Sequence, residues 1–81
     1  EIVMNKEYHI GQCLVCHQGM LEIVKEKTSG KIFVACDECE AEWENPEDAL
    51  KKVNGTRGKY GAVSGVTLNE IQALRWDKYI R

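Results

Sequence analysis

The four cysteines of this 81-residue chain fall into two matched pairs. The first pair is Cys13 and Cys16, the second is Cys36 and Cys39, and 19 residues separate the two pairs. Two sulfurs in a Cys-x-x-Cys turn can converge on one ion at about 2.3 Å, and two such turns complete a tetrahedron. The spacing therefore predicts one Zn²⁺ per chain, held by all four cysteines. Such a site is closed, with no position for a substrate water, so we expect a structural metal.

The same sulfurs are compatible with other chemistry. Iron also suits a tetrahedral four-sulfur site, and disulfides have three connectivities among four cysteines. A thioredoxin-like redox pair is disfavoured, because it needs one Cys-x-x-Cys beside a βαβ unit. His17 directly follows Cys16 and is expected to donate to a thiolate or to face water, with replacement of one ligand as the alternative. His9 has no partner at ligand spacing and is assigned to the surface or to packing.

A β-hairpin between the two pairs would bring the second pair back beside the first. Residues 20–27 show the alternation of a strand, residues 28–31 have the composition of a hairpin turn, and residues 32–35 form the return strand. Residues 42–44 are predicted to form a short third strand, from which Trp43 packs against the hairpin. These strands would position all four sulfurs at one end of a small sheet.

A helix is predicted after the third strand, over residues 46–53. Asn45 can cap this helix, and Pro46 fits its first turn. The glycine-rich residues 56–65 that follow contain neither a Walker motif nor Gly-x-Gly-x-x-Gly. They are interpreted as a connecting loop with Tyr60 on the core, and a phosphate-cradling loop is the weaker alternative.

A second helix is predicted over residues 68–79. Thr67 and Glu70 have the spacing of a capping box, which places the start of the helix. Its apolar residues recur at helical spacing and are expected to contact the core: Leu68, Ile71, Ala73, Leu74, Trp76, Tyr79 and Ile80.

The segment CLVCHQGMLEIVKEKTSGKIFVACDEC, residues 13–39, resembles a zinc ribbon: a cysteine knuckle, a β-hairpin and a second knuckle. With the predicted helices, the resemblance implies an α+β fold, a small zinc ribbon (β-hairpin plus short third strand) with two C-terminal helices. The chain is then a single domain over residues 1–81, with the ribbon in residues 10–45 and a helical extension in residues 46–81. Many ribbons carry Gly just after a knuckle, whereas this chain has His17 after the first and no Gly after the second.

Size and composition exclude several classes of protein. A chain of 81 residues buries a small core and is expected to need a stabilising element such as a metal. No apolar run is long enough to span a membrane, and the N-terminus lacks a signal-peptide pattern. A cytoplasmic location, where thiols stay reduced, is therefore expected. Two histidines without a nucleophile pairing and a closed metal site predict a protein that is not an enzyme.

Charge is unevenly distributed along the chain. Residues 35–50 carry seven acidic residues and no basic one, whereas residues 51–81 carry seven basic residues and two acidic ones. Four thiolates and one divalent ion would take the formal net charge from -2 to -4. Glu47 and Asp48 are explained by the start of a helix, where acids complement the dipole. The other five acids are predicted to bind a basic protein partner: Asp37, Glu38, Glu40, Glu42 and Glu44.

The stretches CDECEAEWENPEDAL and LRWDKYI are similar to those of small stand-alone bacterial zinc-ribbon proteins. Some chains of this sort resemble immunity proteins, which neutralise toxins delivered between competing bacteria. Such toxins are frequently nucleases with basic clefts. The resemblance therefore implies an inhibitor whose acidic surface covers the cleft of a nuclease toxin.

A nucleic-acid-binding ribbon is the alternative function. It would place basic residues on phosphates and stack Tyr60 or Trp76 on bases. The acidic stretch would repel a phosphate backbone, most strongly at low salt, and for this reason nucleic acid is the less favoured partner. The basic residues available to this alternative are Lys51, Lys52, Arg57, Lys59, Arg75, Lys78 and Arg81.

Overall fold

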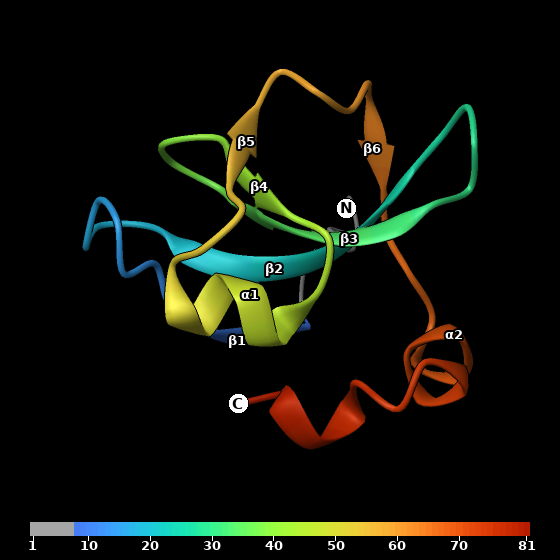
Figure 1. Cartoon of the computed structure of the whole chain (residues 1–81). Coiled ribbons are helices and arrows are strands. Elements are labelled where there is room, and N and C mark those ends of the chain that lie inside the picture. The colour runs from blue at the N-terminus through green and yellow to red at the C-terminus, as the bar shows by residue number, and fades with distance from the viewer. Residues whose placement is uncertain (1–7) are drawn as a thin grey trace, which may run out of the picture.

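The computed structural model describes residues 8–81, which form one antiparallel sheet flanked by short helices (Figure 1). The first seven residues of the predicted 1–81 domain lie outside the described residues. The strands are β1 (His9–Gln12), β2 (Met20–Glu26), β3 (Ile32–Cys36), β4 (Ala41–Trp43), β5 (Thr56–Arg57) and β6 (Val63–Ser64). The helices are α1 (Pro46–Lys51), α2 (Leu68–Ala73) and a 3₁₀ turn, η1 (Asp77–Tyr79).

Strand β2 is the centre of the sheet, in which the strand order is β1-β2-β3-β4-β5 with β6 also paired to β2. Strand β3 pairs along one edge of β2 through five residue pairs, from Leu21 opposite Cys36 to Lys25 opposite Ile32. Strands β1 and β6 share the other edge, because β1 pairs with its first half and β6 with its last two residues. The hairpin of β2 and β3 thus lies in the middle of the sheet, and the other strands extend the sheet from its two edges.

The predicted α+β class, with a hairpin, a third strand and C-terminal helices, is confirmed. The third strand lies one residue earlier than predicted, because Ala41 pairs with Arg57 of β5. Three strands were not predicted, and two of them, β5 and β6, lie within residues 56–65, which were interpreted as a loop. Strands β5 and β6 have only two residues each, too few for a periodic pattern. Strand β5 forms through its pairing with β4, and β6 forms through its pairing with β2.

One face of the sheet carries the main hydrophobic core. Cross-strand pairing places Ile23, Val34 and Trp43 in one row across β2, β3 and β4. Helix α1 adds Ala49 and helix α2 adds Ile71 to the same buried cluster. Three partly buried side chains of the C-terminal segment pack against this core, as their spacing predicted: Trp76, Tyr79 and Ile80.

The opposite face of the sheet is covered by the chain between β5 and β6. Val24 of β2 lies opposite Phe33 of β3 on this face, and both are almost fully buried. The Tyr60 ring stacks on Phe33 with ring centroids 4.0 Å apart. Tyr60 therefore packs on a buried residue, as predicted, and the segment that carries it forms a second covering layer.

Helix α1 is short because both of its ends are fixed by hydrogen bonds. The Asn45 side chain accepts from the Asp48 N–H at 2.8 Å, which confirms the predicted cap. At the other end Lys52 has a left-handed φ of 60°, and the N–H groups of Lys52 and Val53 donate to the carbonyls of Ala49 and Asp48. This Schellman arrangement ends the helix before the predicted end at residue 53.

Helix α2 is shorter than the predicted helix over residues 68–79. Arg75 adopts a left-handed φ of 63°, and the N–H groups of Arg75 and Trp76 donate to the carbonyls of Gln72 and Ile71 at 2.9 and 3.0 Å. A second Schellman motif therefore turns the chain, with Arg75 where Gly is usual. The turn brings Trp76 to the core and leaves three residues of the predicted stripe exposed: Leu68 (41%), Ala73 and Leu74 (42%).

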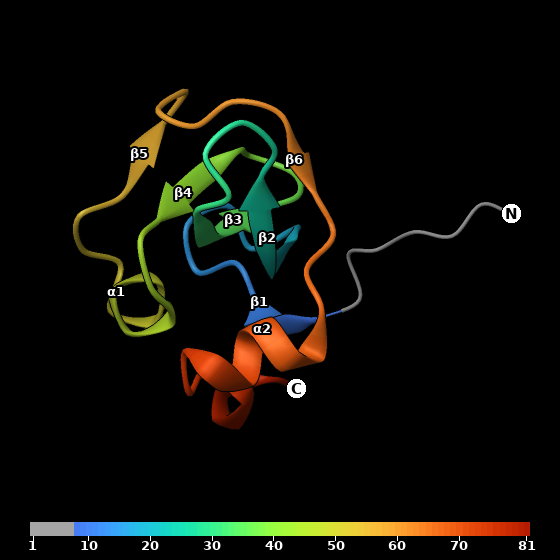
Figure 2. The ribbon, with the colours of Figure 1, turned by 90° about the vertical axis from the view of Figure 1, so that its right-hand side faces the viewer.

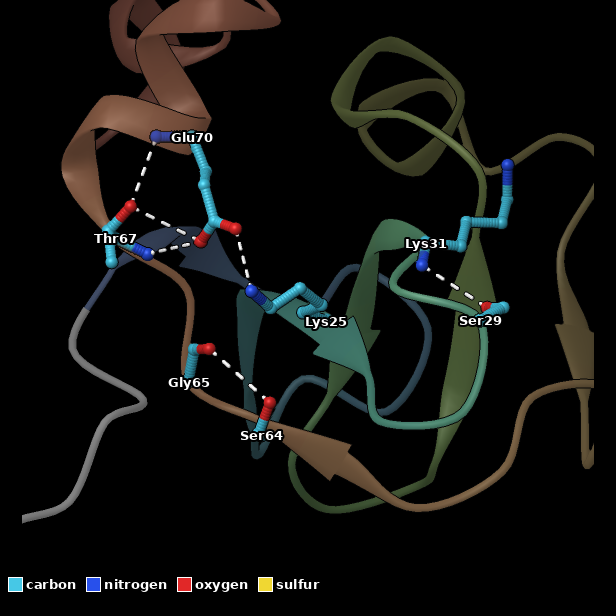
Figure 3. Close-up of polar contacts among 7 residues, drawn as sticks. All are labelled: Lys25, Ser29, Lys31, Ser64, Gly65, Thr67 and Glu70. Atoms are coloured by element: carbon cyan, nitrogen blue, oxygen red, sulfur yellow. Dashed lines mark hydrogen bonds and ion pairs between the residues drawn. The ribbon is translucent and has the colours of Figure 1, made fainter.

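The C-terminal segment is tied to the sheet by polar contacts. The capping box predicted for Thr67 and Glu70 is present, with both reciprocal hydrogen bonds, and Lys25 of β2 lies 2.6 Å from the Glu70 carboxylate (Figure 3). The Arg81 N–H donates to the His9 carbonyl of β1 at 2.9 Å. Figure 2 shows the resulting arrangement, with the C-terminus near β1 and α2 below the sheet.

Candidate metal centre and charged surfaces

The four cysteine sulfurs meet at one end of the hairpin. The Sγ atoms of Cys13, Cys16, Cys36 and Cys39 all lie within 4.8 Å of one another. The Sγ atoms of Cys13 and Cys39 are 3.9 Å apart, and those of Cys16 and Cys36 are 3.6 Å apart. A tetrahedron with metal–sulfur bonds of about 2.3 Å has sulfur–sulfur edges of about 3.8 Å. The four cysteines could therefore hold one metal ion, which is consistent with a zinc ribbon.

Backbone amides surround these sulfurs and point donors at them. The contacts are Val15 N–H to Cys13 (3.4 Å), Gly19 N–H to Cys16 (3.5 Å), and Glu38 and Cys39 N–H to Cys36 (3.3 and 3.4 Å). Hydrogen bonds of this kind stabilise thiolate charge and orient metal ligands. The turns that bring the sulfurs together thus also support their charged form.

The surroundings of two of these thiols shift their pKa values in opposite directions. Hydrogen bonds from the backbone of Gln18 and Gly19 lower the pKa of Cys16 to about 6. Burial raises the pKa of Cys36 to about 12. Because a metal binds thiolates, uptake of an ion would release protons from those thiols that are still neutral at that pH. Metal affinity is accordingly expected to rise with pH.

The two knuckles end in the same backbone conformation. His17 follows Cys16 with a φ of 59°, and Glu40 follows Cys39 with a φ of 63°. Left-handed backbone of this kind is the reason that glycine is common just after a knuckle. The chain therefore keeps the knuckle geometry at the two positions where it departs from the usual residue type, and accepts strain there.

Gly19 allows the two knuckles to approach each other closely. A Cβ atom at this position would lie 2.8 Å from the Cβ of Glu38 and would meet the Asp37 carboxylate. That carboxylate accepts the Met20 N–H at 2.9 Å. Asp37 therefore bridges the second knuckle to the start of β2, a structural role that its position in an acidic stretch did not indicate.

Neither histidine belongs to the cysteine cluster. In residues 8–81 the one cluster that could hold a metal ion contains only the four cysteines, and His17 is exposed. His9 is half-buried in β1, in keeping with a packing role. All four cysteines are free thiols. The four cysteines lie close enough together to hold one metal ion, whereas metal binding itself and the choice of zinc over iron stay predictions.

The five acids predicted to bind a partner have different environments. Glu42 is only 8% exposed, and its carboxylate accepts the Thr56 hydroxyl at 3.0 Å and the N–H groups of Lys59 and Tyr60 at 3.1 and 3.3 Å. It therefore anchors the segment that covers this face of the sheet. Glu44 is exposed and pairs with Lys59 at 3.1 Å.

The remaining acids lie on the second knuckle. Asp37, Glu38 and Glu40 are all exposed, and none of the three ion pairs found within residues 8–81 involves them. The knuckle that completes the cysteine cluster therefore also presents three carboxylates to solvent.

A hollow of about 360 Å³ opens beside this knuckle, over the β3 strand. Glu22 of β2 and Glu42 of β4 lie on either side of Ala35 in β3, and the small Ala35 side chain leaves the space between them. Every charged residue of the described chain that lines the hollow is acidic: Glu22, Asp37, Glu40 and Glu42. Tyr60 lines it too, and its buried hydroxyl has no hydrogen-bond partner within residues 8–81.

The basic residues of the C-terminal third do not form one continuous free set. Lys51 pairs with Glu47 at 3.0 Å, and Lys59 pairs with Glu44. Arg57 donates through Nε to the Cys39 carbonyl at 2.9 Å, beside the metal site. The two aromatic residues considered for base stacking, Tyr60 and Trp76, pack on Phe33 and on the core respectively.

Comparison of the chain with protein-family models, with curated proteins and with solved structures gives no match. Within residues 8–81, no helix is both long and apolar enough to cross a membrane. Function must therefore be argued from the site itself.

Proposed function

We propose that this chain is a non-enzymatic zinc-ribbon module that binds a basic protein partner through its acidic face. The observation that supports the proposal most directly is the hollow whose charged lining residues, Glu22, Asp37, Glu40 and Glu42, are all acidic. It lies beside a knuckle held by the cysteine cluster, so its rim is fixed by the metal site.

Zinc is the proposed metal, and its role is structural. Four thiolates in a closed tetrahedral site suit Zn²⁺, which has no geometric preference of its own from d electrons. The ion would link the knuckle after β1 to the knuckle after β3. Loss of the ion should therefore disorder the acidic rim as well as the core beneath it.

A basic side chain of the partner would enter the hollow. The volume of about 360 Å³ is at the lower end for ligand pockets, a size suited to one arginine or lysine side chain rather than to a larger ligand. A guanidinium group can donate to two carboxylates at once, and the Tyr60 hydroxyl offers a further polar contact. Exposed Glu38, Glu40 and Glu44 would attract a basic surface before contact and so accelerate association.

The most specific form of the proposal is an immunity protein that neutralises a basic, nuclease-type toxin in the cytoplasm. This form is supported by the short motif resemblance and by the acidic face, which would occupy the place of the nucleic acid in a basic cleft. It predicts that the chain competes with RNA or DNA for the nuclease.

Binding of an arginine-rich peptide, and of basic nuclease domains from bacterial toxins, tests the proposal. We expect saturable 1:1 binding, with an association rate that falls about tenfold at low salt when Glu38 and Glu40 are both changed to Lys. Glu47→Lys is the control, because Glu47 is also exposed but, unlike Glu40, does not line the hollow and lies on α1, away from the second knuckle. An equal loss in both variants, or retention of the wild type on heparin and single-stranded DNA instead of on basic proteins, would contradict the proposal.

A further inference from the structure

A second hollow, of about 280 Å³, lies on the other face of the sheet. Trp43 is one of its lining residues, and Glu42 lines the first hollow. Adjacent residues of a strand point to opposite faces, so the two hollows lie on opposite faces of β4. The chain leaves α1 and runs up to β5 beside β4, forming one wall of the second hollow (Figure 1). The lining residues are Val15, Ala41, Trp43, Lys52, Gly55, Thr56 and Arg57.

The charge of this second hollow is opposite to that of the first. Lys52 and Arg57 line it, and no acidic residue of the described chain does. Neither cation takes part in the three ion pairs found within residues 8–81. The Arg57 guanidinium is oriented by its Nε–H, which donates to the Cys39 carbonyl at 2.9 Å, and Lys52 stands at the end of α1.

A buried donor without an acceptor lies in the same wall. Trp43 is only 3% exposed, and its Nε1 has no hydrogen-bond partner within residues 8–81. Nε1 faces Gly55, where an added Cβ would lie 3.0 Å from it, and Gly55 also lines the hollow. Because a buried N–H without an acceptor costs about 1–3 kcal/mol, such groups in a native structure call for a partner.

We propose that the second hollow binds a phosphate monoester. Lys52 and Arg57 supply the two positive charges that a dianion needs, and the remaining guanidinium N–H groups of Arg57 can bind two of its oxygens. The Trp43 indole N–H, which Gly55 covers, would donate to a third oxygen after a small shift of the Gly55 backbone. Because Arg57 is fixed to the knuckle of Cys39, metal binding would also organise this site. This phosphate site goes beyond the proposed function, because it uses none of the acidic residues.

The indole N–H resonance of Trp43 is a direct reporter of this site in the zinc-loaded full chain. Trp76, the other tryptophan, lies outside the hollow and provides an internal reference. We expect inorganic phosphate and adenosine 5′-monophosphate to shift the Trp43 signal in a saturable manner, and adenosine to leave it unchanged. Tighter binding of the nucleotide would identify a nucleotide source, whereas equal binding would mean that the phosphate group alone is recognised. Either result supports the proposal.

Two neighbouring lysines provide a matched pair of variants. Lys52→Gln should weaken phosphate binding about tenfold, because it removes one charge-assisted hydrogen bond. Lys51→Gln should leave it unchanged, since Lys51 pairs with Glu47 and does not line the hollow. Both residues are exposed, so neither change should unfold the chain.

Three results would overturn the proposal: no shift of the Trp43 signal with phosphate, an equal effect of the two lysine variants, or equally tight binding of acetate. Displacement of adenosine 5′-monophosphate by an oligonucleotide that has no terminal phosphate would overturn it as well. That outcome would favour nucleic acid binding by the basic third of the chain. Reversal of Glu38 and Glu40 to Lys should not weaken phosphate binding, which separates failure of this proposal from failure of the proposed function.

Discussion

The left-handed backbone conformation after each cysteine knuckle allows a quantitative prediction of the free energy of unfolding. His17 has a φ of 59°, a conformation that costs a side-chain-bearing residue about 1–2 kcal/mol. Glycine avoids this strain but loses about 0.5–1 kcal/mol of conformational entropy on folding. We therefore expect His17→Gly to stabilise the chain by about 0.5–1 kcal/mol. For a domain of this size the midpoint of thermal unfolding should rise by about 4–8 °C per kcal/mol.

Thermal unfolding followed by circular dichroism measures this effect, at a fixed free zinc concentration because metal binding also raises the midpoint. Gln18→Gly is the control, because Gln18 is exposed and is not among the residues with positive φ. Glycine should destabilise the chain there by about 0.5–1 kcal/mol, since no strain is relieved. If His17→Gly and Gln18→Gly lower the midpoint equally, the left-handed backbone of His17 carries no strain that glycine relieves, which contradicts the prediction.

Three further predictions concern the metal, the contact between the knuckles and the pH dependence of stability. Elemental analysis should find one zinc per chain, and a chelator or Cys36→Ser should abolish the folded circular dichroism spectrum; an unchanged spectrum after chelation would refute a structural metal. Gly19→Ala should destabilise the chain by about 1–3 kcal/mol, because its Cβ would lie 2.8 Å from the neighbouring knuckle. Gly61→Ala, where the nearest contact is 3.3 Å, should have a much smaller effect in the same denaturant titration. The Lys25 ammonium and the Thr67 N–H hold the pKa of Glu70 below its ordinary value of 4.5. The charged Glu70 thus stabilises the fold fully above pH 4.5 and less as the pH falls through its lowered pKa, so Glu70→Gln should reduce the acid-side slope of stability relative to wild type.

Local sequence signals predicted the elements well where a few adjacent residues were sufficient. Asn45 caps α1 and the Thr67–Glu70 box opens α2, because capping requires only groups within one turn. The end of α2 could not be predicted in this way. Its helical periodicity continues to Tyr79, but Arg75 takes the left-handed conformation of a Schellman motif, and the turn packs the partly buried Trp76 against the core.

The acidic stretch shows the same limit for the candidate site. The sequence alone showed seven acids around a cysteine pair, but it could not show which of them are buried or hydrogen-bonded and which are exposed. Pairing with β5 and the segment after it buries Glu42 as an anchor, and Asp37 binds the backbone of Met20. Glu38 and Glu40 alone match the simple picture of exposed, unpaired acids.

The sequence by itself determined which four sulfurs meet, because two Cys-x-x-Cys turns separated by a hairpin are brought to one end of that hairpin. It also determined the helix starts and the imbalance of charge. Only the tertiary structure decided how that charge is arranged. The alternation of side chains in β4 sends Glu42 to one face and Trp43 to the other. Contacts with segments distant in sequence then place an acidic hollow on the first face and a basic hollow on the second. Such contacts have no local pattern from which they could be predicted.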